Sequence, residues 1–80
     1  MKANGDVNEN EYRALTRMAG AGRTGYPERL LIGVKHKSCV VMAYAGYCTQ
    51  INPATDQPND IPTWWITPKG LRILERGGRA

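Results

Sequence analysis

The chain has 80 residues, of which 41% are hydrophobic and 22% charged, and it carries a formal net charge of +4 at pH 7. This length allows one small domain with a thin core. No stretch reaches the roughly 18 consecutive apolar residues of a membrane span, and the first residues lack the apolar region of a signal peptide, so we expect a cytoplasmic location and no membrane partner.

The sequence shows no pattern typical of an enzyme or a metal site. Cys39 and Cys48 do not form a CxxC pair or a zinc-ligand spacing, so buried free thiols are favoured over a redox or metal role. His36 is the only histidine. There is no paired carboxylate in a plausible cleft, no serine–histidine–acid set and no phosphate-binding glycine loop. We therefore predict that the chain is not an enzyme and holds no cofactor and no metal.

The positive charge is unevenly distributed along the chain. It is concentrated in residues 13–37 and 69–80, whereas residues 38–47 carry no charged side chain. This asymmetry favours a polyanionic partner. The alternative is solubility alone, because a net charge of this size is ordinary for a small domain.

The first half of the chain predicts two helices joined by a shorter one. Residues 1–7 are expected to form a flexible tail. Asn8, with Glu11 three residues later, predicts an N-cap and a capping box for a helix that ends near Ala19. The glycines of residues 20–22 end this helix.

A linker over residues 23–26 is expected next. Pro27 then suits the first position of a short helix over residues 27–32, because its missing N–H is not needed there. A turn at residues 33–34 leads into a helix over residues 35–45.

This second long helix has an unusual distribution of charge. Lys35, His36 and Lys37 lie in its first turn, where the helix dipole favours negative groups. Such an arrangement suits contacts with phosphates, and the alternative is an ordinary solvated turn. Because Val41 and Tyr44 lie away from the main apolar side, we expect a wide part of the helix surface to pack against the rest of the protein.

The second half predicts a hairpin. Residues 47–52 form a first strand, residues 53–60 a loop rich in turn residues, and residues 61–66 a second strand. A proline at position 62 indicates that the second strand lies at an edge or starts late. Trp64 and Trp65 should point to opposite sides, one to the core and the other to solvent or a partner.

The last helix has the clearest start in the sequence. Thr67 is the predicted N-cap and Pro68 the first helical residue. The glycines at positions 77 and 78 end it, and residues 78–80 form a short C-terminal tail.

Two short motifs carry a resemblance to a known family. Ala45-Gly46-Tyr47 is similar to the exit of a recognition helix into a wing, and Trp65-Ile66-Thr67-Pro68-Lys69-Gly70-Leu71 is similar to the joint between a wing and the last helix. Together with the order of elements over residues 8–77, they resemble winged helix-turn-helix domains. The resemblance implies a small α+β domain with three helices, a two-stranded wing hairpin and a C-terminal helix.

The resemblance also implies a function. The domain would be a small transcriptional regulator that binds double-stranded DNA, as a homodimer that contacts two half-sites. The recognition helix would enter the major groove, where Val41 or Tyr44 can meet a thymine methyl group. The implied nucleic-acid-binding residues are Lys35, His36, Lys37 and Ser38, with Arg23 and Arg29 placed for phosphates.

The expected wing departs from the family pattern. Residues 53–60 contain no cation but include Asp56 and Asp60, which a phosphate backbone repels. The alternative is therefore a phage or mobile-element inhibitor, for example of the anti-CRISPR type, which keeps the scaffold and binds a host protein or nucleoprotein complex. Its interface would include Trp64, Asp56 and Asp60. A structural subunit of a nucleoprotein assembly is a third, weaker hypothesis.

Overall fold

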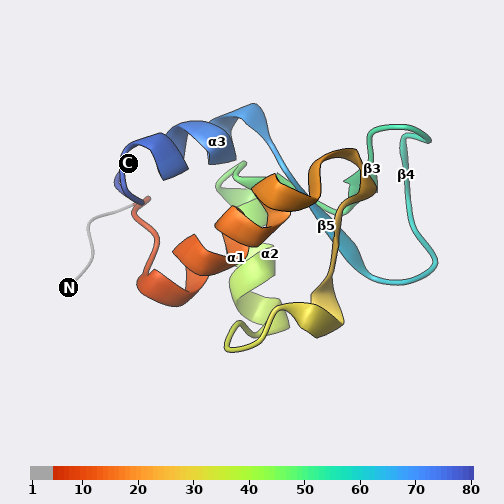
Figure 1. The fold of residues 1–80 in the computed structure, drawn as a ribbon, viewed down its shortest axis with the longest axis horizontal. Helices are drawn as coiled ribbons and strands as arrows, with labels where there is room; N and C mark the ends of the chain where they lie inside the picture. The colour runs from red at the N-terminus through yellow and green to blue at the C-terminus, as the bar shows by residue number, and fades with distance from the viewer. Residues whose placement is uncertain (1–4) are drawn as a thin grey trace.

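The computed structural model describes residues 5–80, so residues 1–4 of the predicted tail lie outside the described residues. Residues 5–7 lie against the other end of the chain (Figure 1). The Val7 N–H donates to the Gly78 carbonyl at 2.9 Å, and the Ala80 N–H donates to Asp6 Oδ1 at 2.7 Å. These bonds join the two ends of the described chain.

Helix α1 spans Glu9–Ala21. Its start confirms the predicted capping box, because the Asn8 side chain accepts from the Glu11 N–H at 2.8 Å and the Asn8 N–H donates to Glu11 Oε1 at 2.8 Å. The helix ends two residues later than expected, where Gly22 adopts φ 58°.

The segment between the two long helices differs from the prediction. The expected linker contains a 3₁₀ turn, η1 (Gly22–Thr24), and is followed by a short strand, β1 (Tyr26–Pro27). The expected helix over residues 27–32 is only a single 3₁₀ turn, η2 (Glu28–Leu30). Pairing of β1 with a strand far along the chain outweighs the local preference of Pro27 for a helix start.

Helices α2 and α3 lie where the sequence predicts them. Helix α2 spans His36–Tyr44 and helix α3 spans Pro68–Glu75. Thr67 is the N-cap of α3, and its side chain accepts from the Gly70 N–H at 3.1 Å. The predicted cap and first residue of the last helix are therefore confirmed.

The strands form a three-stranded sheet in the order β1-β5-β2, and β3 pairs with β4. The bounds of the remaining strands are β2 Cys48–Thr49, β3 Ile51–Asn52, β4 Gln57–Pro58 and β5 Thr63–Ile66. The first expected strand is thus interrupted at Gln50, and the second starts late, as Pro62 indicated. The β3–β4 hairpin extends away from the helices (Figure 1).

The two motifs that carry the family resemblance contact each other. The Thr67 hydroxyl donates to the Gly46 carbonyl, and the Thr67 N–H donates to the Tyr47 carbonyl at 3.2 Å. The start of α3 is thereby bound to the chain that leaves α2. The α+β class is confirmed, and the arrangement is consistent with a winged-helix-like layout.

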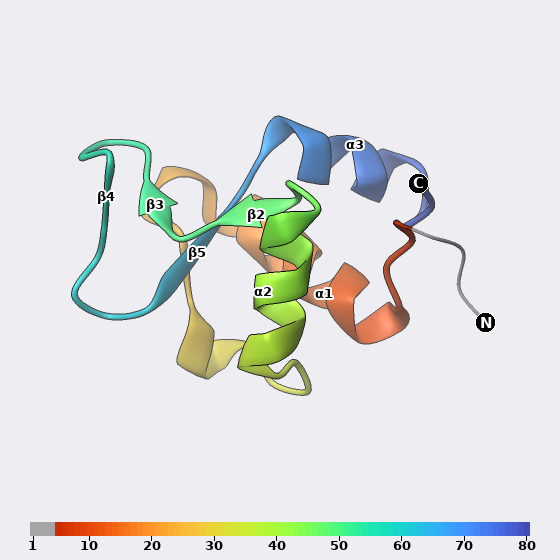
Figure 2. The same ribbon diagram turned by 180° about the vertical axis from the view of Figure 1, so that it is seen from behind.

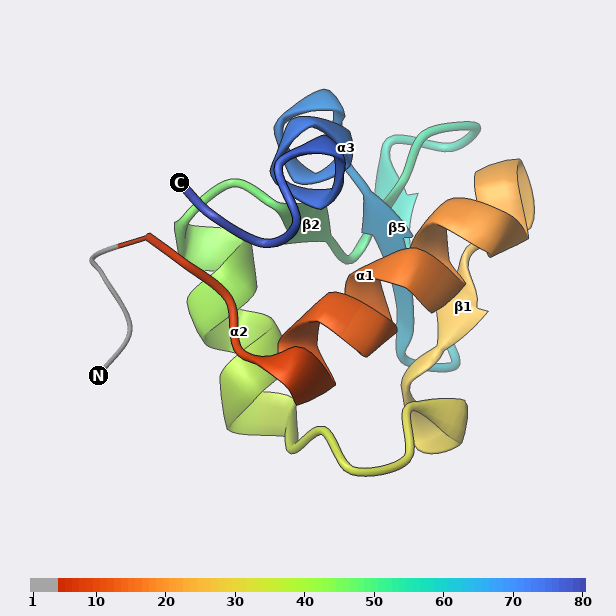
Figure 3. The same ribbon diagram turned by 60° about the vertical axis from the view of Figure 1, so that its left-hand side comes forward.

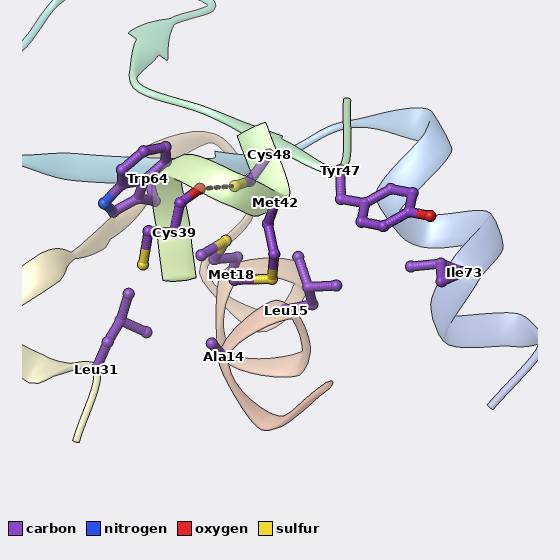
Figure 4. Close-up of a cluster of buried hydrophobic side chains, with 10 residues drawn as sticks. All are labelled: Ala14, Leu15, Met18, Leu31, Cys39, Met42, Tyr47, Cys48, Trp64 and Ile73. Atoms are coloured by element: carbon purple, nitrogen blue, oxygen red, sulfur yellow. Dashed lines mark hydrogen bonds between the residues drawn. The ribbon is translucent and has the colours of Figure 1, made fainter. Parts of the chain in front are cut away.

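The core lies where α1, α2, the sheet and α3 meet (Figures 3 and 4). Leu15 and Met18 of α1, Met42 of α2 and Trp64 of β5 are at most 2% exposed. The other buried members of the cluster are Ala14, Leu31, Cys39, Tyr47, Cys48 and Ile73. With no phenylalanine in the chain, the sulfur-containing side chains and Trp64 fill much of this volume.

Candidate nucleic-acid interface

The start of α2 is open to solvent and has no side-chain cap. Lys35 is the N-cap residue, with φ −81° and ψ 153°, and its side chain makes no capping hydrogen bond. The helix has no acidic residue in its first turn, and both Lys35 and Lys37 are exposed. The backbone N–H groups of a helix start and adjacent cations together suit a phosphate oxygen.

The ring of His36 is held in place by Glu28 of η2. His36 Nδ1 lies 2.6 Å from Glu28 Oε1, and the Trp64 Nε1–H donates to the same oxygen at 2.9 Å. A carboxylate only accepts, so His36 carries a proton on Nδ1. The Glu28 carboxylate thereby connects η2, the first turn of α2 and β5, and it leaves the Nε2 side of the exposed imidazole available.

These bonds also change the acidity of Glu28. Burial raises its pKa, but the hydrogen bonds from His36 and Trp64, with the electrostatic effect of His36, outweigh burial, so the pKa lies below its usual value. Glu28 was not among the predicted site residues. It lies 36 positions from Trp64, and no local sequence pattern indicates that contact.

The structure brings most of the predicted nucleic-acid residues together. Lys35, His36, Lys37 and Ser38 occupy the start of α2, and Arg29 is exposed in η2, which the Glu28–His36 contact holds against that start. Arg23 lies elsewhere, in a hollow of about 270 Å³ beside Pro53 and Ala54. The extended chain of β1 separates Arg23 from the start of α2.

The predicted protein interface does not form as expected. Asp56 and Asp60 are exposed at the hairpin, but Trp64 is 2% exposed and Trp65 3% exposed. The expectation that one tryptophan faces solvent is wrong, because β5 is the central strand and is covered on both faces. Trp64 packs in the core, and Trp65 packs under Gly25 and donates its indole N–H to the Arg23 carbonyl at 2.8 Å.

The outer face of α2 is apolar and exposed. Val41 is 51% exposed and Tyr44 is 89% exposed, so a smaller part of the helix surface is packed against the protein than the sequence predicts. A hollow of about 320 Å³ lies between α2 and β2 beside Tyr44 and extends to the edge of Trp64. Figure 2 shows α2 at the front of the molecule, with its first turn at the bottom.

Comparisons with protein-family models, with curated proteins and with solved structures found no match.

The two cysteines are buried and free. Burial raises the pKa of Cys39 to about 11 and that of Cys48 to about 12, and the Cys48 thiol lies 3.6 Å from the Cys39 carbonyl oxygen. Within residues 5–80, no three His, Cys, Asp or Glu side chains gather in a group that could hold a metal ion. Over the same residues, no helix combines the length and apolar character needed to cross a membrane.

Proposed function

We propose that this chain binds double-stranded DNA through the start of α2. The observation that carries the proposal is the uncapped first turn, which lies between the exposed cations Lys35 and Lys37, with Arg29 on the adjoining turn. Phosphate contacts from such groups position a domain on a duplex, and contacts to base edges then give specificity.

In this proposal each part of α2 has a separate role. Lys35 and Lys37 neutralise phosphates, and the free Nε2 side of His36 meets a base edge or a phosphate oxygen. Val41 and Tyr44, farther along the outer face, contact thymine methyl groups in the major groove.

The biological role proposed is that of a transcriptional regulator that acts as a homodimer. A nine-residue helix reaches few base pairs, and two copies would recognise two half-sites about one helical turn apart.

The test is a fluorescence-anisotropy titration of a short labelled duplex at several salt concentrations. Lys35→Gln combined with Lys37→Gln should weaken binding. It should also reduce the salt slope, which is the slope of the logarithm of the binding constant against the logarithm of the salt concentration, by about 1.8 units, since each lost phosphate contact removes about 0.9. The matched control is Arg13→Gln with Arg17→Gln, which removes the same formal charge from exposed positions on α1. An equal loss in both variants would mean that total charge, and not the start of α2, determines binding.

A second candidate function is protein binding, and a specific observation favours it. The outer face of α2 exposes Val41 and Tyr44, and the β3–β4 hairpin and the loop after it carry Asp56 and Asp60, with no cation between residues 50 and 60. These features suit an inhibitor from a phage or mobile element that binds a host protein or nucleoprotein complex. The absence of duplex binding at low salt, with host-protein capture that Tyr44→Ser abolishes, would favour this candidate over DNA binding.

A further inference from the structure

One side of α3 carries a row of three cations, Lys69, Arg72 and Arg76. Their spacing of three and four residues places them on the same side of the helix, and all three are exposed. Within residues 5–80, none of the three forms an ion pair. We call this set the α3 cation row.

The α3 cation row borders a hollow of about 340 Å³. Buried Tyr47 and Ile73 lie at its apolar side, and Gly5 and Ala80 at the joined chain ends line its rim. The Tyr47 hydroxyl donates to the Gly5 carbonyl at 2.5 Å, which fixes the ring against the rim. The three cations therefore line one side of a hollow.

Lys69 is held in position by two neighbours that precede β2. Its ammonium nitrogen lies 5.6 Å from the centre of the Tyr47 ring, a cation–π distance. Its aliphatic stem passes over Gly46, where a Cβ would come within 3.3 Å of Lys69 Cδ. These contacts reduce the freedom that Lys69 would lose on binding a ligand.

Helix stability alone does not explain the row. Arg72 and Arg76 lie near the C-terminal end of α3, where the helix dipole favours cations. Lys69 lies in the first turn, where the same dipole disfavours a positive charge. A row that continues into the first turn suggests a ligand with several negative charges.

We propose that the α3 cation row binds consecutive phosphates of a nucleic-acid strand, at a surface separate from the start of α2. Lys69 and Arg76 are seven positions apart, which corresponds to a rise of about 10 Å along the helix axis. One strand of a duplex presents a phosphate about every 3.4 Å of rise along the duplex axis, so a row of this length can contact more than one phosphate of a strand. Among residues 5–80, those that line the hollow include no acidic side chain.

The two surfaces lie at opposite ends of α2. Helix α3 begins beside Gly46 and Tyr47, just beyond the last turn of α2, and the nine residues of α2 extend about 13 Å from there to its first turn. Figure 2 shows α3 at the top and the start of α2 at the bottom. Together with the proposed DNA contact at the start of α2, on which this step rests, the α3 cation row would let the protein hold two nucleic-acid segments and bridge them.

The first experiment measures duplex binding by anisotropy in the Lys35→Gln, Lys37→Gln variant, where the α3 cation row is the remaining proposed surface, with and without Arg72→Gln and Arg76→Gln. Loss of the two arginines should lower the slope of the logarithm of the binding constant against the logarithm of the salt concentration by about 1.8 units, so the loss of affinity between about 50 and 200 mM salt becomes about 12-fold smaller. Adding Arg13→Gln and Arg17→Gln to the same variant should leave the slope unchanged, and thermal unfolding checks that each variant folds. A slope that loss of Arg72 and Arg76 leaves unchanged would overturn the proposal.

The second experiment tests bridging. A bead-bound duplex should capture a free labelled duplex through the unmodified protein, and either Lys35→Gln with Lys37→Gln or Arg72→Gln with Arg76→Gln should abolish capture. If bridging survives the loss of Arg72 and Arg76, a dimer must bridge the duplexes through the start of α2 alone, and the inference is overturned. Bridging that survives loss of Lys35 and Lys37 would instead refute the proposed function, so the two failures are distinguishable.

A competition experiment separates the two sources of phosphate. Inorganic phosphate at the same ionic strength should displace the duplex no more than chloride does, because a single phosphate meets only part of the row. If phosphate alone displaces the duplex from the Lys35→Gln, Lys37→Gln variant, the row is a site for a free anion, and the nucleic-acid assignment is wrong.

Discussion

The backbone carbonyl of Tyr47 lies directly against Gly70: a Cβ on Gly70 would come within 2.1 Å of this oxygen. The contact lets the first turn of α3 approach the chain that enters β2, where Thr67 bonds to Gly46 and Tyr47. It also places Lys69 over the Tyr47 ring. One glycine thus determines how closely the last helix packs, and with it the position of the α3 cation row.

Replacement of Gly70 should therefore be strongly destabilising. Gly70→Ala forces α3 away from Tyr47, and we expect a loss of at least about 3 kcal/mol in the free energy of unfolding, the upper end of the usual overpacking range. Urea denaturation measures it.

A matched control is available in α1. Gly20 is helical, and a Cβ there would meet nothing within 4 Å, so Gly20→Ala should stabilise the protein by roughly 0.5–1 kcal/mol. A Gly70→Ala variant as stable as the unmodified protein would show that α3 can shift without loss.

The Glu28 carboxylate is expected to contribute to stability through Trp64. Glu28→Ala leaves the indole N–H of a buried tryptophan without its acceptor, which should lower the free energy of unfolding by about 1–3 kcal/mol. Chemical denaturation followed by tryptophan fluorescence measures the change. Glu28→Gln retains an oxygen acceptor and should lose less, and equal losses in the two variants would contradict this explanation.

The same carboxylate should make stability depend on pH. The pKa of Glu28 is lowered from 4.5 in the folded state, so the unfolded chain binds the proton more readily. The stabilisation is fully present above pH 4.5 and is lost as the pH falls through the lowered pKa. The difference in stability between the unmodified protein and Glu28→Gln should therefore shrink in acid, and a difference that grows below pH 4.5 would contradict the direction of the shift.

Both thiols should react slowly in the folded protein. Because burial raises the pKa of Cys39 from 9.0 to about 11 and that of Cys48 to about 12, the thiolate fraction falls about 100-fold and about 1,000-fold. Iodoacetamide labelling near pH 8, followed by mass spectrometry, should modify the protein rapidly in urea and far more slowly without it. Comparable rates in the two conditions would show that the core opens readily.

The features that the sequence predicts well depend on neighbours a few positions apart. Asn8 and Glu11 form a capping box across three residues, and Thr67 caps α3 by a bond to Gly70 across three more. Such bonds form within one helical turn whatever the rest of the chain does. The exposed cations at the start of α2 are predictable for the same reason, since their placement follows from where that helix begins.

Other features arise only when distant segments meet. Tyr26 pairs with Trp64, and this pairing forms β1 where the sequence predicts a linker. Because β5 is packed on both faces, Trp64 and Trp65 are both buried, although their alternation along the strand predicts that one of them is exposed. The Glu28–His36–Trp64 contacts and the hollow beside the α3 cation row also join residues far apart in the chain. Local hydrogen bonding sets the ends of the helices, but burial and long-range pairing are decided by how the helices and strands pack, because these energies depend on neighbours that no short stretch of sequence contains.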